Sequence, residues 1–108
     1  MMKPRTRIEM YLAVLAKDKD AVTLPVPITR IEMYLAQIAG ENVTLPERPI
    51  TRIEMYLAKI AGEDVTIPER PITRVEMYLA AIAGEDNEVP EPITRVEMYL
   101  AKWVDKRK

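Results

Sequence analysis

Cysteine, histidine and phenylalanine are absent from this chain of 108 residues, and glycine occurs only three times. Without cysteine the chain can form neither a disulfide framework nor a thiolate metal site. Without histidine as well, most metal centres and nucleophilic triads are excluded. No apolar run approaches the ~20 residues that a helix needs to span a bilayer. The composition therefore predicts no metal site, no cofactor and no membrane span.

The chain also has no large excess of charge of either sign, because 16 basic residues nearly balance 17 acidic ones and the formal net charge is −1. A nucleic-acid-binding protein should show a basic excess or a basic face. The basic run at residues 106–108 is interpreted as a solubilising tail. Residues 1–5 precede no apolar stretch, so we expect no signal peptide. We expect neither nucleic acid nor membrane as a partner.

What the chain does have is one unit copied end to end. The block T-R-[IV]-E-M-Y-L-A begins at Thr6, Thr29, Thr51, Thr73 and Thr94, at spacings of 23, 22, 22 and 21 residues. A regular period of this size is typical of repeat architectures. We therefore expect a single repeat domain over residues 1–108, with units at about 4–26, 27–48, 49–70, 71–91 and 92–108.

The third unit shows how each copy should fold. Thr51 and Glu54 have the spacing of a capping box, and Ile50 with Met55 fits the hydrophobic staple. Gly62 supplies the left-handed stop, so a helix is predicted over residues 52–61. Two prolines in each linker prevent neighbouring helices from merging, and Val-Thr-Ile before them predicts a very short extended segment.

Helices of about ten residues are too short to be stable alone in water, so the units must stack. We predict a mainly α fold in which five helices and their extended segments form a small solenoid. The alternative is a trimeric fibre of short three-helix bundles. In the solenoid, Arg52 approaches Glu76, or Arg74 approaches Glu54 if the winding is reversed, and each tyrosine lies over small alanines. The residues assigned to this packing are Arg30, Glu32, Tyr34, Arg52, Glu54, Tyr56, Arg74, Glu76 and Tyr78.

The terminal units depart from the pattern, as capping units do in solenoids. Trp103 stands where the other units have Ile or Leu, so we expect it to cover the C-terminal end of the stack. The first unit has Lys17 in place of a glycine stop and one inserted residue in 18–20.

Two patterns of charge resemble chemical sites and are interpreted as structural. The acidic residues after the glycines lack the alternate spacing and closing carboxylate of a calcium loop. The repeated Arg and Glu have no histidine or nucleophile beside them, so inter-repeat pairing is favoured over acid–base work. We predict that the chain is not an enzyme, and that it binds no small molecule.

Methionine holds one slot in every repeat, nearly opposite the Ile/Leu stripe of the helix. One interpretation is the hydrophobic staple already described. The other is a row of adaptable thioethers that, with neighbouring alanines, forms a surface for another protein. The residues of this predicted Met/Ala surface are Met10, Met33, Met55, Met77, Met98, Ala36, Ala58 and Ala80.

The string P-[IL]-T-R-I-E-x-Y-L-A-x-I-A-G-E-D-V-T-L-P is carried by residues 49–68 and, with small changes, by residues 27–46 and 71–90. It resembles short repeats in virion structural proteins of phages and prophages of Gram-positive bacteria. The resemblance implies a capsid decoration or head-fibre component. Such a protein is made in the bacterial cytoplasm, resides in the virion, binds capsid or other virion proteins and can be a homo-oligomer. The alternatives are a soluble adaptor using the Met/Ala surface and an artificial idealised repeat protein.

Overall fold

The computed structural model describes residues 4–17 and 23–107, and within them it contains five α-helices and no β-strand. The helices are α1 (Arg7–Leu15), α2 (Arg30–Ile38), α3 (Arg52–Ile60), α4 (Arg74–Ile82) and α5 (Arg95–Arg107). The predicted helical class and the predicted number of repeats are confirmed. The insertion within residues 18–20, the chain start at 1–3 and Lys108 lie outside the described residues.

Each helix begins at its predicted threonine. In α3, the Thr51 hydroxyl accepts a hydrogen bond from the Glu54 N–H at 3.2 Å, which satisfies one of the unpaired donors of the first turn. The Glu54 carboxylate accepts from the Ile50 N–H at 3.1 Å. The reciprocal bond of the capping box therefore reaches one residue further back than predicted, to the residue before the cap.

The helices α2, α3 and α4 end just before a glycine in the left-handed region, with φ of +103° at Gly40, +99° at Gly62 and +103° at Gly84. Lys17 takes the same role after α1, with φ of +56°. A side chain there costs more than glycine does, because its Cβ crowds the backbone. Asp105 occupies the equivalent position in α5, which continues to Arg107. Without the glycine, the chain thus still turns at Lys17 after α1, whereas α5 continues through Asp105.

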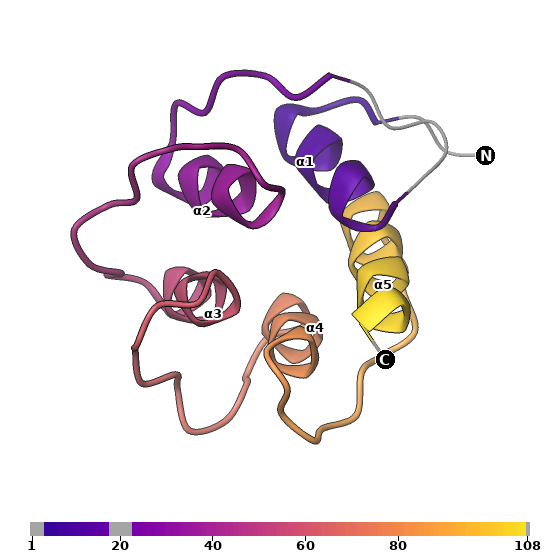
Figure 1. Cartoon of the computed structure of the whole chain (residues 1–108). Helices are drawn as coiled ribbons and strands as arrows, with labels where there is room; N and C mark the ends of the chain where they lie inside the picture. The colour runs from indigo at the N-terminus through magenta and orange to yellow at the C-terminus, as the bar shows by residue number, and fades with distance from the viewer. Residues whose placement is uncertain (1–3, 18–22, 108) are drawn as a thin grey trace.

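The five helices form a closed ring (Figure 1). Each helix contacts the one before and the one after it, and α1 also contacts α5. The molecule is a disc with extents of 35 × 32 × 20 Å. A solenoid stack with two free ends is not confirmed, because the first and last repeats pack against each other. The core is completed within one chain.

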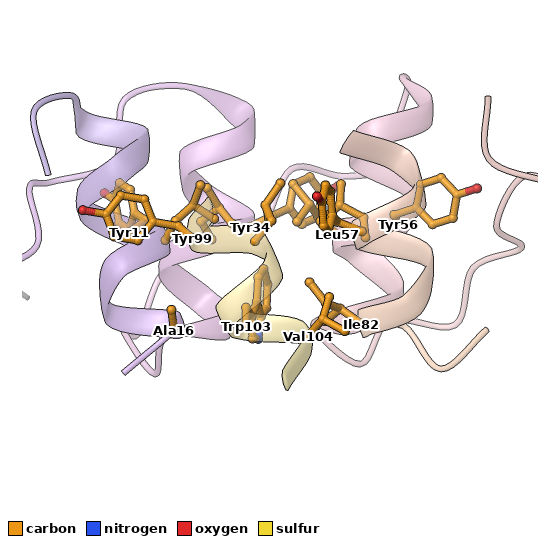
Figure 2. Packing of buried hydrophobic residues seen from close by; sticks show 14 of the residues in the cluster. Tyr11, Ala16, Tyr34, Tyr56, Leu57, Ile82, Tyr99, Trp103 and Val104 are labelled. Carbon is orange, nitrogen blue, oxygen red and sulfur yellow. The ribbon is translucent and has the colours of Figure 1, made fainter. Parts of the chain in front are cut away.

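Aliphatic side chains fill the centre of the ring in tiers along its axis. The first tier, nearest the helix N-termini, contains Ile8, Ile31, Ile53, Val75 and Val96. The second tier contains Leu12, Leu35, Leu57, Leu79 and Leu100, all at most 3% exposed. Trp103 and Ile82 lie beyond the leucines, towards the helix C-termini (Figure 2). Spacing of three and four residues places all three tiers on the same helix face.

The tyrosines lie at the level of the second tier, and all five are at most 1% exposed. The hydroxyl groups of Tyr11 and Tyr56 point away from the centre of the packed row (Figure 2). Tyr11 donates to the Pro25 carbonyl at 2.6 Å, and Tyr78 donates to the Pro90 carbonyl. These bonds fasten the irregular linkers to the outside of the ring, where Figure 1 shows them running. Val65 and Ile67 pack against the core without forming a strand.

Candidate interaction surface

Five Arg–Glu pairs join the first turns of neighbouring helices. Arg52 Nη2 lies 2.9 Å from Glu76 Oε1, and Arg52 Nε donates to both carboxylate oxygens at 3.1 and 3.2 Å. The repeats therefore wind in the direction that places Arg52 beside Glu76 of the next repeat. The alternative pairing of Arg74 with Glu54 does not form, because Arg74 pairs with Glu97. Among the described residues, the pairs are Arg7–Glu32, Arg30–Glu54, Arg52–Glu76, Arg74–Glu97 and Arg95–Glu9.

The last pair closes the ring, since Arg95 Nε on α5 donates to Glu9 Oε1 on α1 at 3.1 Å. Because every pair connects first turns, all five helix N-termini lie at one end of the disc. The glutamates are 3–5% exposed. The guanidinium groups are half-exposed, so each ion pair lies at the boundary between core and solvent.

The ion pairs lower the pKa of Glu32, Glu54, Glu76 and Glu97 and so hold these four carboxylates ionised. The hydrogen bond from Arg7 lowers the pKa of Glu32, with further help from the Ile28 N–H. The hydrogen bond from Arg74 likewise lowers the pKa of Glu97. Burial on its own would raise the pKa of Glu54, but the hydrogen bonds from Arg30 and the Ile50 N–H outweigh it and the pKa is lowered. A carboxylate held in this state is a poor general acid at neutral pH.

The arrangement therefore uses the repeated charges to join repeats. Within residues 4–17 and 23–107, no group of three or more acidic side chains is placed to hold a metal ion. In the same part of the chain, no helix is long and apolar enough to cross a bilayer.

The structure places the two halves of the predicted Met/Ala surface differently. Ala36, Ala58 and Ala80 are fully buried, so they are core residues and the prediction that they line an exposed surface is wrong. They lie on the flank where neighbouring helices meet, which requires small side chains. The methionines are partly accessible: Met98 is 40% exposed, and the other four are half-buried. Whether these methionines bind another protein stays a prediction.

Trp103 does not cover a free end of a stack, because the ring leaves none. It is 3% exposed and lies at the C-terminal end of the ring interior, in the same lower row as Val104 and Ile82 (Figure 2). Its size lets one side chain from α5 reach the ends of both α1 and α2, where it lines a shallow depression with Leu15 and Ile38.

The large exposed apolar side chains gather where sequence reasoning expected a covered staple. Ile28, Ile50, Ile72 and Ile93 are 67–71% exposed. Each one precedes the threonine that caps a helix, so all four lie at the N-terminal end of the ring. We call this end the N-terminal face, defined by these four isoleucines and the first tier around the axis. The signal was present in the sequence as an isoleucine before the cap in four of the five repeats.

The N-terminal face is hollowed near its centre. The hollow is shallow and wide open to solvent, and it is lined by first-tier side chains, two capping threonines and two glutamates (Ile8, Ile31, Ile53, Val75, Thr29, Thr51, Glu32 and Glu54). Below it, an axial cavity of about 70 Å³ is lined only by the first and second tiers. A cavity walled by aliphatic groups alone offers water no hydrogen bonds, so we expect it to be dry.

Comparisons with family models, with curated proteins and with solved structures returned no match.

Proposed function

We propose that this chain is a non-enzymatic structural protein that acts through protein–protein contacts, with the N-terminal face as its binding surface. The observation that carries the proposal is the row of four isoleucines, each about 70% exposed, at one end of the disc. Exposed apolar side chains that lie on one face together with an apolar depression, and that serve no internal packing, typically mark an interaction site.

The remaining side chains of the repeat support a structural role, because the fold already uses them. Threonine and glutamate cap the helices, arginine joins them, and tyrosine, leucine and alanine are buried. The isoleucine before the cap is the large apolar residue that the ring leaves uncovered in four of the units, whereas Val26, at 78% exposed, has no equally exposed counterpart in the other linkers. A rigid disc with an apolar end can dock without reordering its backbone, which lowers the entropic cost of binding.

The finer proposal is that the partner is a capsid or other virion protein and that the chain is a capsid decoration or head-fibre component. Its support is the resemblance of residues 49–68, and of their copies, to repeats in virion proteins of phages of Gram-positive bacteria. A particle surface presents many identical sites. A small rigid disc with one apolar end suits attachment to such sites.

The experiment is cosedimentation of the purified chain with capsids of a phage whose virion carries the T-R-I-E-x-Y-L-A repeat. We expect saturable binding that is lost when Ile28, Ile50, Ile72 and Ile93 are replaced together by serine. The comparison variant replaces Met10, Met33, Met55 and Met77 by glutamine, which changes four side chains on the outward side of the helices instead.

Loss of binding in the isoleucine variant and its survival in the methionine variant would support the N-terminal face. Loss of binding only in the methionine variant would show that the methionines, and not the N-terminal face, form the binding surface. If the unaltered chain does not sediment with the capsids, the virion assignment fails. Circular dichroism of both variants checks that the ring is intact.

A further inference from the structure

We propose that, when no other partner is bound, two copies of this chain pair through their N-terminal faces. The inference rests on the proposed function in one respect, namely that this face binds protein. It adds the identity of the occupant in the free state, which is a second copy of the same ring. Such pairing would keep the exposed isoleucines out of water until a partner competes for them.

The N-terminal face carries both parts of a self-complementary contact. The four isoleucines are exposed on it, with 67–71% of their surface accessible. The apolar hollow beside them is lined by Ile8, Ile31, Ile53 and Val75. A two-fold axis lets an exposed isoleucine of each ring enter the hollow of the other, so the same residues serve on both sides. The contact is closed and stops at two copies.

The size of the face agrees with a dimer. A disc with extents of 35 × 32 Å has an end face of roughly 900 Å², and a standard protein interface buries ~800 Å² per partner. Full or nearly full overlap is therefore needed for a stable pair. The disc is also rigid at this end, because all five first turns are capped and joined by ion pairs.

The opposite end of the disc is a poor partner for this face. There the loops after the glycines expose the carboxylates of Glu41, Glu63, Asp64, Glu85 and Asp86. Stacking that end on the isoleucines would remove carboxylates from water beside exposed residues that are themselves more often acidic than basic, namely Glu47, Glu69 and Glu91 against Arg48 and Arg70. Most of the buried carboxylates would then have no charged partner, which is costly. Pairing of two N-terminal faces is therefore favoured over a head-to-tail filament.

Pairing brings ten helix N-termini together, and their partial positive charges would repel if they were bare. Each N-terminus instead carries a glutamate, such as Glu54, whose carboxylate accepts from the backbone N–H before the cap. That carboxylate is in turn neutralised by an arginine from the neighbouring helix. The charges of the first turns are thus satisfied inside each ring and do not oppose the contact.

The test is the mass of the purified chain by light scattering. Interfaces of this size have affinities from micromolar to picomolar, so a protein concentration of about 100 µM exceeds the weakest expected dissociation constant. We expect a mass of twice 12.4 kDa. The variant with Ile28, Ile50, Ile72 and Ile93 replaced by serine should have the mass of one chain and an unchanged circular dichroism spectrum.

The matched control replaces four exposed residues near the helix C-termini by serine, namely Glu41, Lys59, Glu63 and Lys106, which leaves the net charge unchanged. It should remain a dimer. A mass of 12.4 kDa for the unaltered chain would overturn the inference, as would a mass three times that of the chain, which would favour the trimeric fibre. A dimer that survives in the isoleucine variant and is lost in the control would also overturn it.

These outcomes separate the inference from the proposed function. A monomer that still sediments with capsids removes the self-pairing and leaves the virion role intact. A dimer that does not sediment with capsids supports the self-pairing and removes the virion role. If both hold, adding capsids should convert dimers into bound single rings, because the two contacts compete for one face.

Discussion

The joints inside the ring and the joint that closes it are built differently. Between α2 and α3 the chain is continuous, and Arg30 holds the linker as well as the next helix. Its Nη2 lies 2.9 Å from Glu54 and donates to the Arg48 carbonyl at 2.5 Å. No linker connects α5 to α1, so Arg95 and Glu9 join two helices that are 86 residues apart in sequence. Closure therefore depends on non-covalent contacts alone.

The sequence departs from the repeat where this closure occurs. Trp103 and Val104 of α5 stand at the positions that Ile60 and Ala61 occupy in α3. The first two are 3% and 4% exposed, whereas the second two are half-buried. The equivalent residue of α4, Ile82, is only 2% exposed, so burial at this position is not confined to the closing joint. The comparison teaches that α5 differs in the size of its buried side chains, and this larger apolar area offsets the missing covalent connection, since burial of apolar area is the dominant stabilising term.

The largest effect is expected from Trp103→Ala, which removes the largest buried apolar side chain of the helix that closes the ring. Truncation of a buried tryptophan costs about 3–5 kcal/mol. Ile60→Ala at the equivalent internal position should cost less, about 2 kcal/mol, because Ile60 is only half-buried. Urea unfolding followed by circular dichroism measures both. Equal losses would show that the closing joint has no special dependence on Trp103.

The next effect comes from pH, which acts on the internal joints. Glu32 and Glu97 have a lowered pKa because arginine hydrogen bonds hold them ionised. A lowered pKa in the folded state means that the unfolded chain binds protons more readily. Stability is therefore full above the ordinary value of 4.5 and is lost as pH falls through the lower, folded values.

Urea midpoints measured from pH 7 down to pH 3 should fall progressively once the pH is below about 4.5. The variant Glu32→Gln removes one of the titrating groups, so its curve should be shallower. A midpoint that does not change over this range would contradict the role of the ion pairs in joining repeats.

A single substitution of a paired glutamate should have a smaller effect, and it compares the two joints directly. Glutamine keeps the capping acceptor and removes the charge. Glu54→Gln should lose about 1–2 kcal/mol, because a hydrogen bond to a charged group is replaced by a neutral one. We expect Glu9→Gln to lose the same amount, since both joints use the same pair. A much larger loss of unfolding free energy in Glu9→Gln than in Glu54→Gln would show that the ion pair, and not Trp103, holds the ring closed.

Local features of the fold could be predicted from the sequence, because they depend on neighbouring residues. Thr51, Glu54 and Gly62 define the third helix to within one residue, since caps act over three or four positions. The partner of Arg52 was left as one of two alternatives. Helical phase shows which side of the helix carries Arg52, but it does not show the direction in which the units wind.

Ring closure and the exposed face could not be predicted in this way. Closure requires each repeat to rotate by a fifth of a turn, and that rotation depends on how buried side chains such as Tyr56 and Ala58 pack together. The exposure of Ile50 was missed because the staple rule predicts that Met55 covers it, whereas Ile50 remains 67% exposed. Both properties depend on tertiary geometry, which a period of 22 residues does not encode explicitly.

The smallest effect is expected at the axial cavity, which both kinds of joint surround. Val75 and Val96 stand in the first tier where the other three helices have isoleucine, and they line the cavity of about 70 Å³. Val75→Ile and Val96→Ile each add one methylene to an apolar void, so each should stabilise the fold by about 0.5–1 kcal/mol.

Val96 belongs to the helix that closes the ring and Val75 to an internal helix. If Val75→Ile stabilises while Val96→Ile destabilises, α5 is already tightly packed around Trp103 and the added carbon strains it. Urea midpoints of the two single variants and of the double variant decide between these outcomes, and equal gains that add would show that the ring is uniform at its N-terminal end.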